Sequence, residues 1–396
     1  MKPFHIPVSP FDAPDPFMTY DPDTGYYYAL FTRGSKLELF RSRHAGTIVT
    51  DNDSKIILQA DGTNNIWGDI WAPEMHRAPN GLWYIYTSCR VTREPGQKRL
   101  FIVESEFSDP FGPWHFKCFP TPDIFSIDPT VYTDKNGQQY ICYSRVDPTL
   151  GQVLDIRPLD NPYTFGTPCA MIAYAEYDWE LVPPYDKGKI NEGAFFVGNG
   201  DRLFIVYSGN GCWSDDYCLG VLEYTGEAGN VADMCSADCW KKHPKPIFEK
   251  GNDVFGPGHA SFFRSPDGTE LWCAYHGMKQ TNPSVTGAPR YFNIQKIEFD
   301  RDGNLLIGNI NSLVNTLFLF YLKPVCSTAI IVSSEILRSL TYRQNSIFIS
   351  SMQQCQNQHR LVGIRHFHCS AIFQKVIKPV LCGYRRLIKG LCRSGI

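Results

Sequence analysis

The chain has 396 residues, of which 43% are hydrophobic and 20% charged, so it is long and apolar enough to bury a sizeable core. Its 32 glycines, 28 prolines and 14% aromatic residues favour many strands and tight turns over a helix bundle. The net charge of −2 gives no reason to expect a nucleic-acid partner, and the absence of any apolar run of 18 residues predicts no transmembrane helix.

The N-terminal segment, Met1–Phe11, carries one lysine and three prolines and does not read as a signal peptide. The compartment is therefore left open. From residue 15 onward, five segments repeat one pattern: a short apolar strand, a glycine turn eight to ten positions on, and an aromatic strand. The repeats begin, at spacings of 57, 56, 64 and 67 residues, at Asp15, Ala72, Asp128, Glu192 and His259.

The five turns have the composition of β-hairpin turns, with glycine at Gly25, Gly81, Gly137, Gly200 and Gly268. A unit of about 60 residues has room for two hairpins, and five four-stranded sheets around an axis form a β-propeller. The fifth unit needs two further strands, expected at Arg290–Phe299 and Leu305–Ile307. We therefore predict an all-β, five-bladed propeller over residues 1–309. A β-sandwich with similar hairpins is the alternative, which the fivefold register of the glycines disfavours.

The first strand of each propeller blade lines the central channel. The repeat starts would thus bring Asp15, Asp128, Glu192 and His259 to a common funnel, although charges are unusual in such apolar segments. Carboxylates held close together in a partly dry site acquire different pKa values, as acid and base chemistry requires. Cleavage of a glycosidic bond needs two carboxyls, and a third can orient the acid. The simpler alternative is that these residues only cap turns, since Asp-Pro pairs start turns easily.

Five motifs in this order are specific, although each alone is weak: Ala13-Pro14-Asp15-Pro16-Phe17, Trp71-Ala72-Pro73-Glu74, Ser126-Ile127-Asp128-Pro129-Thr130, Asn191-Glu192-Gly193 and Gly256-Pro257-Gly258-His259. With them, residues 10–309 resemble the family 43 glycoside hydrolases, a five-bladed propeller family of α-L-arabinofuranosidases, arabinanases and β-xylosidases. The resemblance implies an inverting mechanism with Asp15 as general base, Glu192 as general acid, and Asp128 raising the pKa of the acid and orienting it. It also implies that His259 lies at the channel centre and holds either a metal ion, often a structural calcium reached through water, or a water network, and that the chemistry needs no cofactor.

Three further residues are candidates for substrate binding. Trp71 could offer its ring to the apolar face of a sugar, or simply pack in the core. Arg290 resembles an arginine that reaches the sugar, with a surface arginine at a strand edge as the alternative. Phe31 ends an aromatic strand, Tyr26–Phe31, that resembles arabinofuranosidases. Glu74 and His276 are interpreted as structural.

The resemblance of Tyr26–Phe31 and Leu271–Met278 favours an exo-acting or debranching enzyme on α-L-arabinofuranosyl residues of plant cell-wall polysaccharides or oligosaccharides. A β-xylosidase is the first alternative, and a catalytically inactive sugar-binding propeller is the second. We expect a monomer with an arabinose- or xylose-containing substrate and no nucleic-acid or membrane partner. Nine cysteines lie in residues 1–309, and two pairs in polar loops could form disulfides: Cys212 with Cys218, and Cys235 with Cys239.

The last part of the chain differs in composition. Residues 310–396 carry 11 Lys or Arg and one acidic residue, Glu335, whereas residues 1–309 have a net charge of −12. This tail has five cysteines, no Trp and no clear periodicity, and we expect it to be poorly ordered. Its composition is typical of a frameshift or mispredicted exon. The alternative is a genuine basic appendage for an acidic polymer or membrane surface. We expect a chain that ends at Asn309 to keep its activity.

Overall fold

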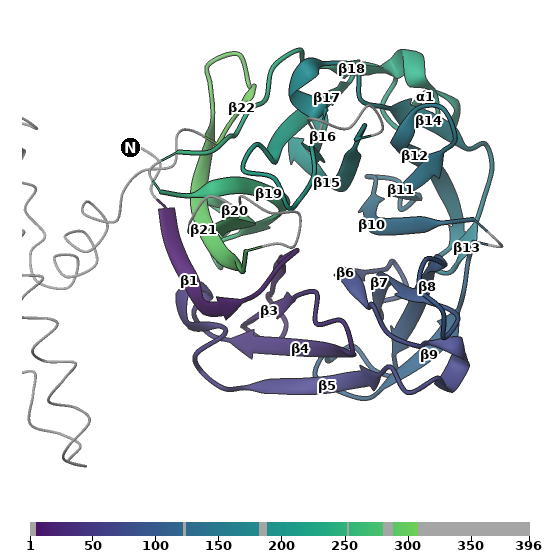
Figure 1. The fold of residues 1–396 in the computed structure, drawn as a ribbon, viewed down its shortest axis with the longest axis vertical. Coiled ribbons are helices and arrows are strands. Elements are labelled where there is room, and N and C mark those ends of the chain that lie inside the picture. The colour runs from purple at the N-terminus through teal and green to yellow at the C-terminus, as the bar shows by residue number, and fades with distance from the viewer. Residues whose placement is uncertain (1–4, 122–123, 182–187, 252, 280–287, 308–396) are drawn as a thin grey trace, which may run out of the picture. The chain divides into compact units, whose positions relative to one another are not determined.

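The computed structural model describes residues 5–121, 124–181, 188–251, 253–279 and 288–307. The tail predicted for residues 310–396 lies outside the described residues, so its expected disorder and its origin stay predictions. The described residues form mostly β-strands, arranged in five sheets around a common centre (Figure 1).

In four of the five sheets the strands follow one another along the chain, and the fifth sheet joins strands from both ends of the described chain. Each sheet is one blade. Blade I contains β2 (Phe17–Asp21), β3 (Tyr26–Leu30), β4 (Lys36–Ser42) and β5 (Ser54–Gln59). Blade II contains β6 (Trp71–Arg77), β7 (Trp83–Arg90), β8 (Lys98–Ser105) and β9 (Trp114–Cys118). Blade III contains β10 (Ser126–Thr133), β11 (Gln139–Asp147), β12 (Gly151–Asn161), β13 (Thr164–Phe165) and β14 (Ala170–Ala173).

Blade IV contains β15 (Asn191–Asn199), β16 (Arg202–Gly209), β17 (Cys218–Tyr224) and β18 (Trp240–Lys242). Blade V contains β19 (Phe255–Arg264), β20 (Leu271–Met278), β21 (Arg290–Phe299), β22 (Leu305–Leu306) and β1 (His5–Asp12). The described helices are short: α1 (Val231–Met234) and the 3-10 turns η1 (Ala45–Thr47), η2 (Thr63–Asn65), η3 (Asp178–Glu180) and η4 (Ala237–Cys239). No helix among the described residues is long and apolar enough to cross a membrane.

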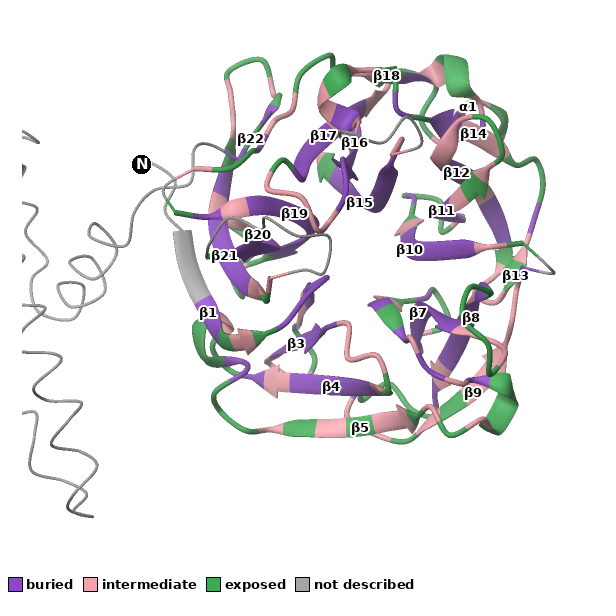
Figure 2. Ribbon diagram, in the orientation of Figure 1, coloured by how far each residue is buried: buried purple, intermediate pink, exposed green. Residues whose placement is uncertain are grey.

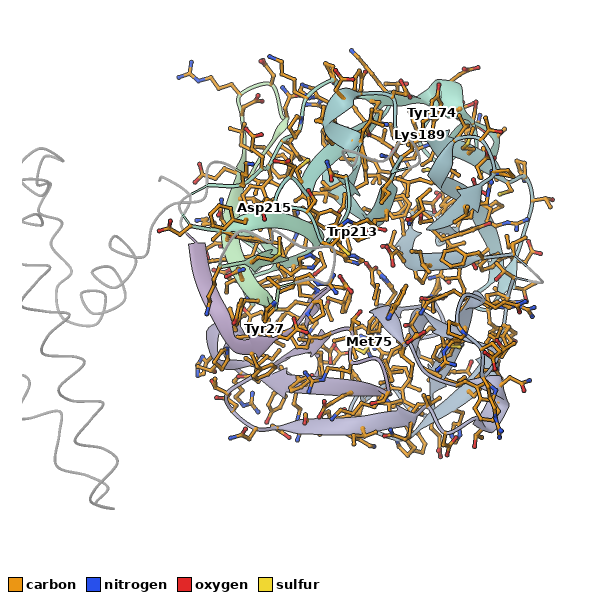
Figure 3. All side chains as sticks on the ribbon, viewed as in Figure 1. Tyr27, Met75, Tyr174, Lys189, Trp213 and Asp215 are labelled. Atoms are coloured by element: carbon orange, nitrogen blue, oxygen red, sulfur yellow. The ribbon has the colours of Figure 1, made fainter. Side chains whose placement is uncertain are left out.

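The innermost strands contact one another in a closed ring: β2 with β6, β6 with β10, β10 with β15, β15 with β19, and β19 with β2. This closure confirms the five-bladed propeller and excludes the sandwich. The five turn glycines all have positive φ, between 60° and 83°, as the hairpin pattern predicted. Side chains fill the spaces between neighbouring blades (Figure 3), and much of the inner strands is buried (Figure 2). One buried cluster joins Tyr84 and Tyr86 of blade II to Val131 and Ile141 of blade III.

Blade V is closed by both ends of the described chain. The predicted strand Arg290–Phe299 is β21, and the strand expected at Leu305–Ile307 is the two-residue β22. The strand β22 pairs with β21 as expected, and β21 also pairs with β1, a strand that the sequence did not indicate. Two prolines, Pro7 and Pro10, obscure the strand pattern of β1, and an edge strand tolerates proline because its outer N–H groups are not needed for pairing.

The nine cysteines of the described residues are all free. The two disulfides suggested by the sequence are therefore wrong. Cys218 and Cys235 instead lie buried among apolar side chains, with 3% and 6% of their surface exposed. Cys89, Cys142 and Cys273 are buried free thiols, as expected from their apolar strands.

Candidate active site

One residue near the start of each blade has a left-handed backbone. The φ angles are 54°, 45°, 54°, 56° and 46° at Asp15, Ala72, Asp128, Gly193 and His259. In blades II to V the strand register shifts at this point, which marks a β-bulge. A bulge re-aims the side chains next to it, and a left-handed non-glycine residue stores strain that is often found at functional sites. The repeat therefore builds five similar corners around the channel.

The fourth repeat differs from its sequence alignment by one residue. Glu192 was aligned with Asp15 and Asp128, but Gly193 occupies the left-handed position in blade IV. A Cβ on Gly193 would lie 2.9 Å from Nδ1 of His259, so the close packing favours glycine there, although the other four corners hold a similar backbone angle with a side chain. Glu192 thus leaves the strand one residue earlier than the two aspartates, and its carboxyl has different neighbours.

Asp15 lies among four side chains from blades I and V. Its Oδ1 is 3.1 Å from Nη1 of Arg290 and 3.5 Å from Nδ1 of His259, and its Oδ2 accepts a 2.6 Å hydrogen bond from the Thr32 hydroxyl. Nδ1 of His276 lies 3.3 Å from Oδ1. Burial alone would raise the pKa of Asp15, but Arg290 and the two histidines outweigh it and hold this pKa well below its usual value. Asp15 is therefore a carboxylate at neutral pH.

Glu192 is buried, and its carboxyl accepts hydrogen bonds from two residues. Nε2 of Gln152 donates to Oε2 at 2.9 Å, and the Tyr217 hydroxyl donates to Oε1 at 3.0 Å. Burial raises the pKa of Glu192 to about 7, with Asp15 adding to the rise and the two hydrogen bonds opposing it. Glu192 therefore holds its proton at mildly acidic pH, where Asp15 does not.

Asp128 is the third buried carboxyl of the group and interacts with the other two. Its Oδ2 accepts the main-chain N–H of Gly193 at 3.1 Å and lies 3.9 Å from Nδ1 of His259. Burial raises the pKa of Asp128 well above its usual value, and the charges of Glu192 and Asp15 raise it further. The structure thus brings the three predicted carboxylates into one interacting group, in which the pKa of Asp15 is lowered and the pKa values of Glu192 and Asp128 are raised. Such a pair of separated pKa values is what an acid and a base in one site require.

Of the three candidates for substrate binding, Arg290 and Trp71 have accessible side chains, whereas Phe31 does not. Arg290 lies in the site and pairs with Asp15, so it is not a surface arginine at a strand edge. Trp71 is 36% exposed, and Nζ of Lys98 lies 3.0 Å from the centre of its ring. The exposed part of Trp71 leaves room for contact with a sugar, which stays a prediction.

Phe31 has a different environment from the one predicted. It has no exposed surface, and its ring packs against Phe40 and Phe292 at centroid distances of 5.5 and 5.2 Å. A side chain without accessible surface cannot touch a sugar, so the structure gives Phe31 a packing role. The aromatic pattern of its strand does not separate the two roles.

Replacing Phe31 with alanine tests this directly. Phe31→Ala is expected to lower the free energy of unfolding by roughly 3–5 kcal/mol, because a buried ring leaves a cavity. Urea unfolding followed by tryptophan fluorescence measures the loss, and Phe31→Leu should cost clearly less. A variant of unchanged stability whose KM rises would return Phe31 to the substrate site.

The sequence missed several residues that contact the carboxyls: Thr32, Gln152, Tyr217 and the site role of His276. Thr32 also accepts the main-chain N–H of Ala72 at 2.7 Å, so it joins blade II to Asp15. These residues lie outside the repeat starts from which the set of carboxyls was predicted. Polar residues such as Gln152, placed beside apolar strand residues, were the one available clue.

The expected calcium ion fits these residues poorly. Calcium prefers six to eight oxygen ligands, whereas the channel position predicted for it supplies the single imidazole of His259. Among the described residues, no group of three or more His, Cys, Asp or Glu is placed to hold a metal ion. Nδ1 of His259 faces Asp15 and Asp128 instead. A contact of His259 with a metal through water stays a prediction, and no step of the chemistry is assigned to a metal.

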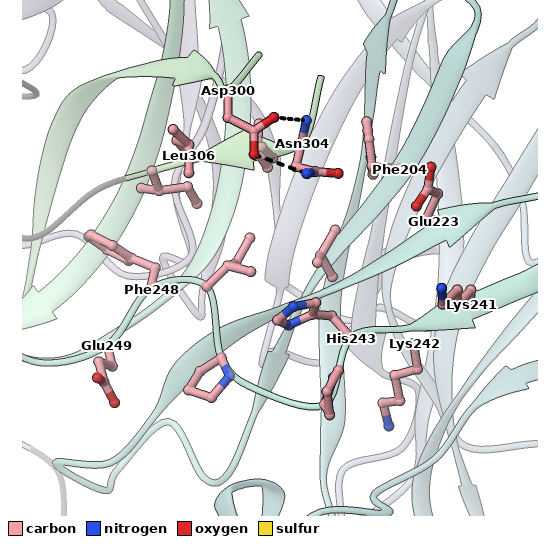
Figure 4. Close-up of a pocket in the computed structure, with 16 residues that line it drawn as sticks. Phe204, Glu223, Lys241, Lys242, His243, Phe248, Glu249, Asp300, Asn304 and Leu306 are labelled. Atoms are coloured by element: carbon pink, nitrogen blue, oxygen red, sulfur yellow. Dashed lines mark hydrogen bonds between the residues drawn. The ribbon is translucent and has the colours of Figure 1, made fainter. Parts of the chain in front are cut away.

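A separate groove of about 580 Å³ lies at the outer side of blades IV and V (Figure 4). Its lining includes Phe204, Lys242, Phe248 and Leu306, and Asn304 donates two hydrogen bonds to Asp300 at its edge. None of the three carboxyl groups lines it. We therefore place the candidate site in the channel, where the charged groups converge, and not in this groove.

Comparisons with known proteins show the family and the fold. The family model described as "Glycosyl hydrolases family 43" matches residues 4–305. An extracellular exo-α-(1→5)-L-arabinofuranosidase of Streptomyces chartreusis is 31% identical over 67% of this chain and 80% of its own length. The α-L-arabinofuranosidase 43 of Humicola insolens is 32% identical over 60% of this chain, which spans about half (49%) of that relative. The crystal structure of an α-L-arabinofuranosidase from Lactobacillus brevis superposes with a TM-score of 0.68 at 26% identity, over 77% of this chain and 97% of that one.

Proposed function

The chain belongs to family 43 of the glycosyl hydrolases, and we propose that it is an inverting exo-acting or debranching α-L-arabinofuranosidase. The observation that carries the proposal is the pairing of a buried carboxylate with a depressed pKa, Asp15, and a buried carboxylic acid with a raised pKa, Glu192. One group can accept a proton and the other can donate one at the same pH. The arabinofuranosidase names of the relatives from Streptomyces and Humicola support the choice of sugar.

In the proposed reaction, Glu192 gives its proton to the glycosidic oxygen as the bond from the anomeric carbon to this oxygen breaks. A water molecule attacks the anomeric carbon from the opposite face and forms the new C–O bond, while Asp15 takes the proton that the water loses. The leaving alcohol departs neutral, and the products are the free sugar with inverted configuration and the shortened glycan. The proton on Asp15 then returns to Glu192 through solvent.

The neighbouring residues prepare the two carboxyls for these roles. Arg290 and Thr32 fix the two oxygens of Asp15, and the charge of Arg290 keeps it ionised. The charge of Asp128 favours the protonated form of Glu192 when Asp128 is ionised, and its own hydrogen bond from Gly193 orders the strand that carries Glu192. Asp128 therefore modulates and orients the acid without entering the bond changes.

The substrate class is tested with two aryl glycosides. We expect purified protein to release p-nitrophenol from the α-L-arabinofuranoside with a higher kcat/KM than from the β-D-xyloside. The reverse order would assign the chain to β-xylosidases, and a well-folded protein that releases nothing from either would be a sugar-binding propeller. Proton NMR of the first product formed from an arabino-oligosaccharide should show the β-anomer, and an α-anomer would contradict inversion.

The pH dependence follows from the two shifted groups. Asp15 must be ionised and Glu192 protonated, so kcat/KM for the free enzyme should be nearly flat through mildly acidic pH and fall above about pH 7. The acidic limb should lie below the usual pKa of aspartate, because the folded environment depresses the pKa of Asp15. Initial rates measured from pH 3 to 9 check both limbs. An alkaline limb near pH 5 would mean that Glu192 is not held protonated as proposed.

A further inference from the structure

Tyr217 contacts the proposed acid, Glu192, directly, and it reaches the proposed base, Asp15, through His276. Its hydroxyl donates to Oε1 of Glu192 at 3.0 Å, and its ring stacks on the imidazole of His276, with centroids 5.5 Å apart and planes 4° from parallel. The ring is buried and the hydrogen bond joins two buried groups. Tyr217 follows a loop between β16 and β17 whose Trp213 lies near the centre of the ring of blades (Figure 3).

His276 continues this contact to the base. Its Nδ1 accepts the main-chain N–H of Asp15 at 3.1 Å and lies 3.3 Å from the carboxyl oxygen Oδ1. Burial lowers the pKa of His276 to about 4, so the ring is neutral and can accept that hydrogen bond. Asp15 has a left-handed backbone that is strained for a residue with a side chain, and a hydrogen bond to its N–H helps to hold it there.

A glycine makes room for this arrangement. Gly258 pairs with His276 across β19 and β20, and a Cβ on Gly258 would lie 2.3 Å from two carbons of the Tyr217 ring. The ring of Tyr217 therefore lies flat against the backbone of one strand and beside the imidazole of the next. Gly258 belongs to the Gly256–His259 motif, whose glycine at 258 is explained by this contact.

We propose that Tyr217 is a positioning residue that ties the acid to the base: its hydroxyl orients Glu192, and its ring holds His276 against the main chain of Asp15. The inference rests on the proposed function, because it assigns these two carboxyls their roles. In the reaction Glu192 becomes negatively charged as it gives up its proton, and the Tyr217 hydroxyl stabilises that charge. The ring acts on Asp15 only through His276.

Two substitutions, each assayed on two substrates, separate the role of the Tyr217 hydroxyl from the role of its ring. Tyr217→Phe removes the hydroxyl but keeps the ring, so kcat on an arabino-oligosaccharide should fall roughly 10–100-fold, the value of a hydrogen bond to a charged group, with little change in KM. On a dinitrophenyl arabinofuranoside, whose leaving group needs no proton, the loss should be less than about threefold. Tyr217→Leu removes the ring as well and should lose activity on both substrates, because the support of Asp15 is also gone.

A direct measurement of Glu192 keeps the test independent of activity. The hydrogen bond from Tyr217 lowers the pKa of Glu192, so Tyr217→Phe should raise this pKa and move the alkaline limb to higher pH. Titration of carbon-13-labelled glutamate carboxyls by NMR reads the shift in the folded protein. Gly258→Ala, which leaves every polar group in place, should displace the ring and shift the same resonance in the same direction.

Two controls match these changes elsewhere in the fold. Tyr84→Phe removes a hydroxyl that donates to Glu104 at 2.5 Å in blade II, and Gly220→Ala places a Cβ 2.5 Å from the ring of Tyr207. Both should keep kcat within about threefold, with melting temperatures measured for all variants.

Three results would overturn the inference. They are a Glu192 resonance that does not shift in Tyr217→Phe, equal losses of kcat by Tyr217→Phe on the two substrates, and a Gly220→Ala variant whose kcat falls as far as that of Gly258→Ala. A wild-type protein that cleaves no arabinofuranoside would instead overturn the proposed function, while the NMR titration would still decide whether Tyr217 orients Glu192.

Discussion

Glu192→Gln is expected to lower kcat on an arabino-oligosaccharide by about 10²–10⁴-fold, the usual contribution of a positioned proton donor. The amide has almost the shape of the carboxyl, and its oxygen can still accept one of the two hydrogen bonds from Gln152 and Tyr217, but it cannot act as the acid. Because the fall of rate above about pH 7 reflects loss of the proton from Glu192, that limb should also disappear from the pH profile of the variant.

The leaving group distinguishes this role from a purely structural one. A dinitrophenyl arabinofuranoside departs without protonation, so Glu192→Gln should lose far less activity on it than on the oligosaccharide. Glu74→Gln is the matched control: Glu74 is also a buried carboxyl with a raised pKa, but its oxygen bonds to Nε2 of His76 at 2.8 Å and not to Glu192 or Asp15. It should remain within a few fold of the wild type. Equal losses on both substrates would remove Glu192 from the role of acid.

Asp15→Asn is expected to lower kcat by a similar 10²–10⁴-fold, but equally on both substrates, because activation of water is needed whatever group departs. The amide can still accept from the Thr32 hydroxyl. It cannot take a proton from water, and it leaves the charge of Arg290 without its partner. The variant should therefore also be less stable than the wild type, which thermal unfolding measures.

A second variant shows whether the loss concerns the attack of water. Asp15→Gly keeps the left-handed backbone, since glycine adopts a φ of 54° without strain, and it opens space for a small anion. Azide should then restore part of the rate on the dinitrophenyl substrate and yield the glycosyl azide of inverted configuration. Asp12→Asn is the control, because the Asp12 carboxyl accepts the main-chain N–H of Arg290 at 2.7 Å and has no proposed part in the attack of water. No product with azide and unequal losses on the two substrates would exclude Asp15 as the base.

The repeat was visible in the sequence because it is local. Each hairpin needs a glycine with positive φ in its turn and aromatic residues in its strand, and these requirements recur at nearly constant spacing. The same periodicity placed Asp15, Asp128 and His259 in register at left-handed corners of the channel. The closing strand β1 was missed, because prolines hide its pattern and its partner β21 lies almost 300 residues away in the sequence.

The sequence by itself determined the five-bladed architecture, and it indicated the acidic residues and the histidine at the repeat starts. Only the tertiary structure decided how those charges differ. Asp15 and Glu192 are both buried carboxyls, yet Arg290 and His276 reach Asp15 from blade V while Gln152 and Tyr217 reach Glu192 from blades III and IV. A pKa depends on burial and on the charges within a few ångströms, and these neighbours are brought together by the closure of the ring and not by proximity along the chain.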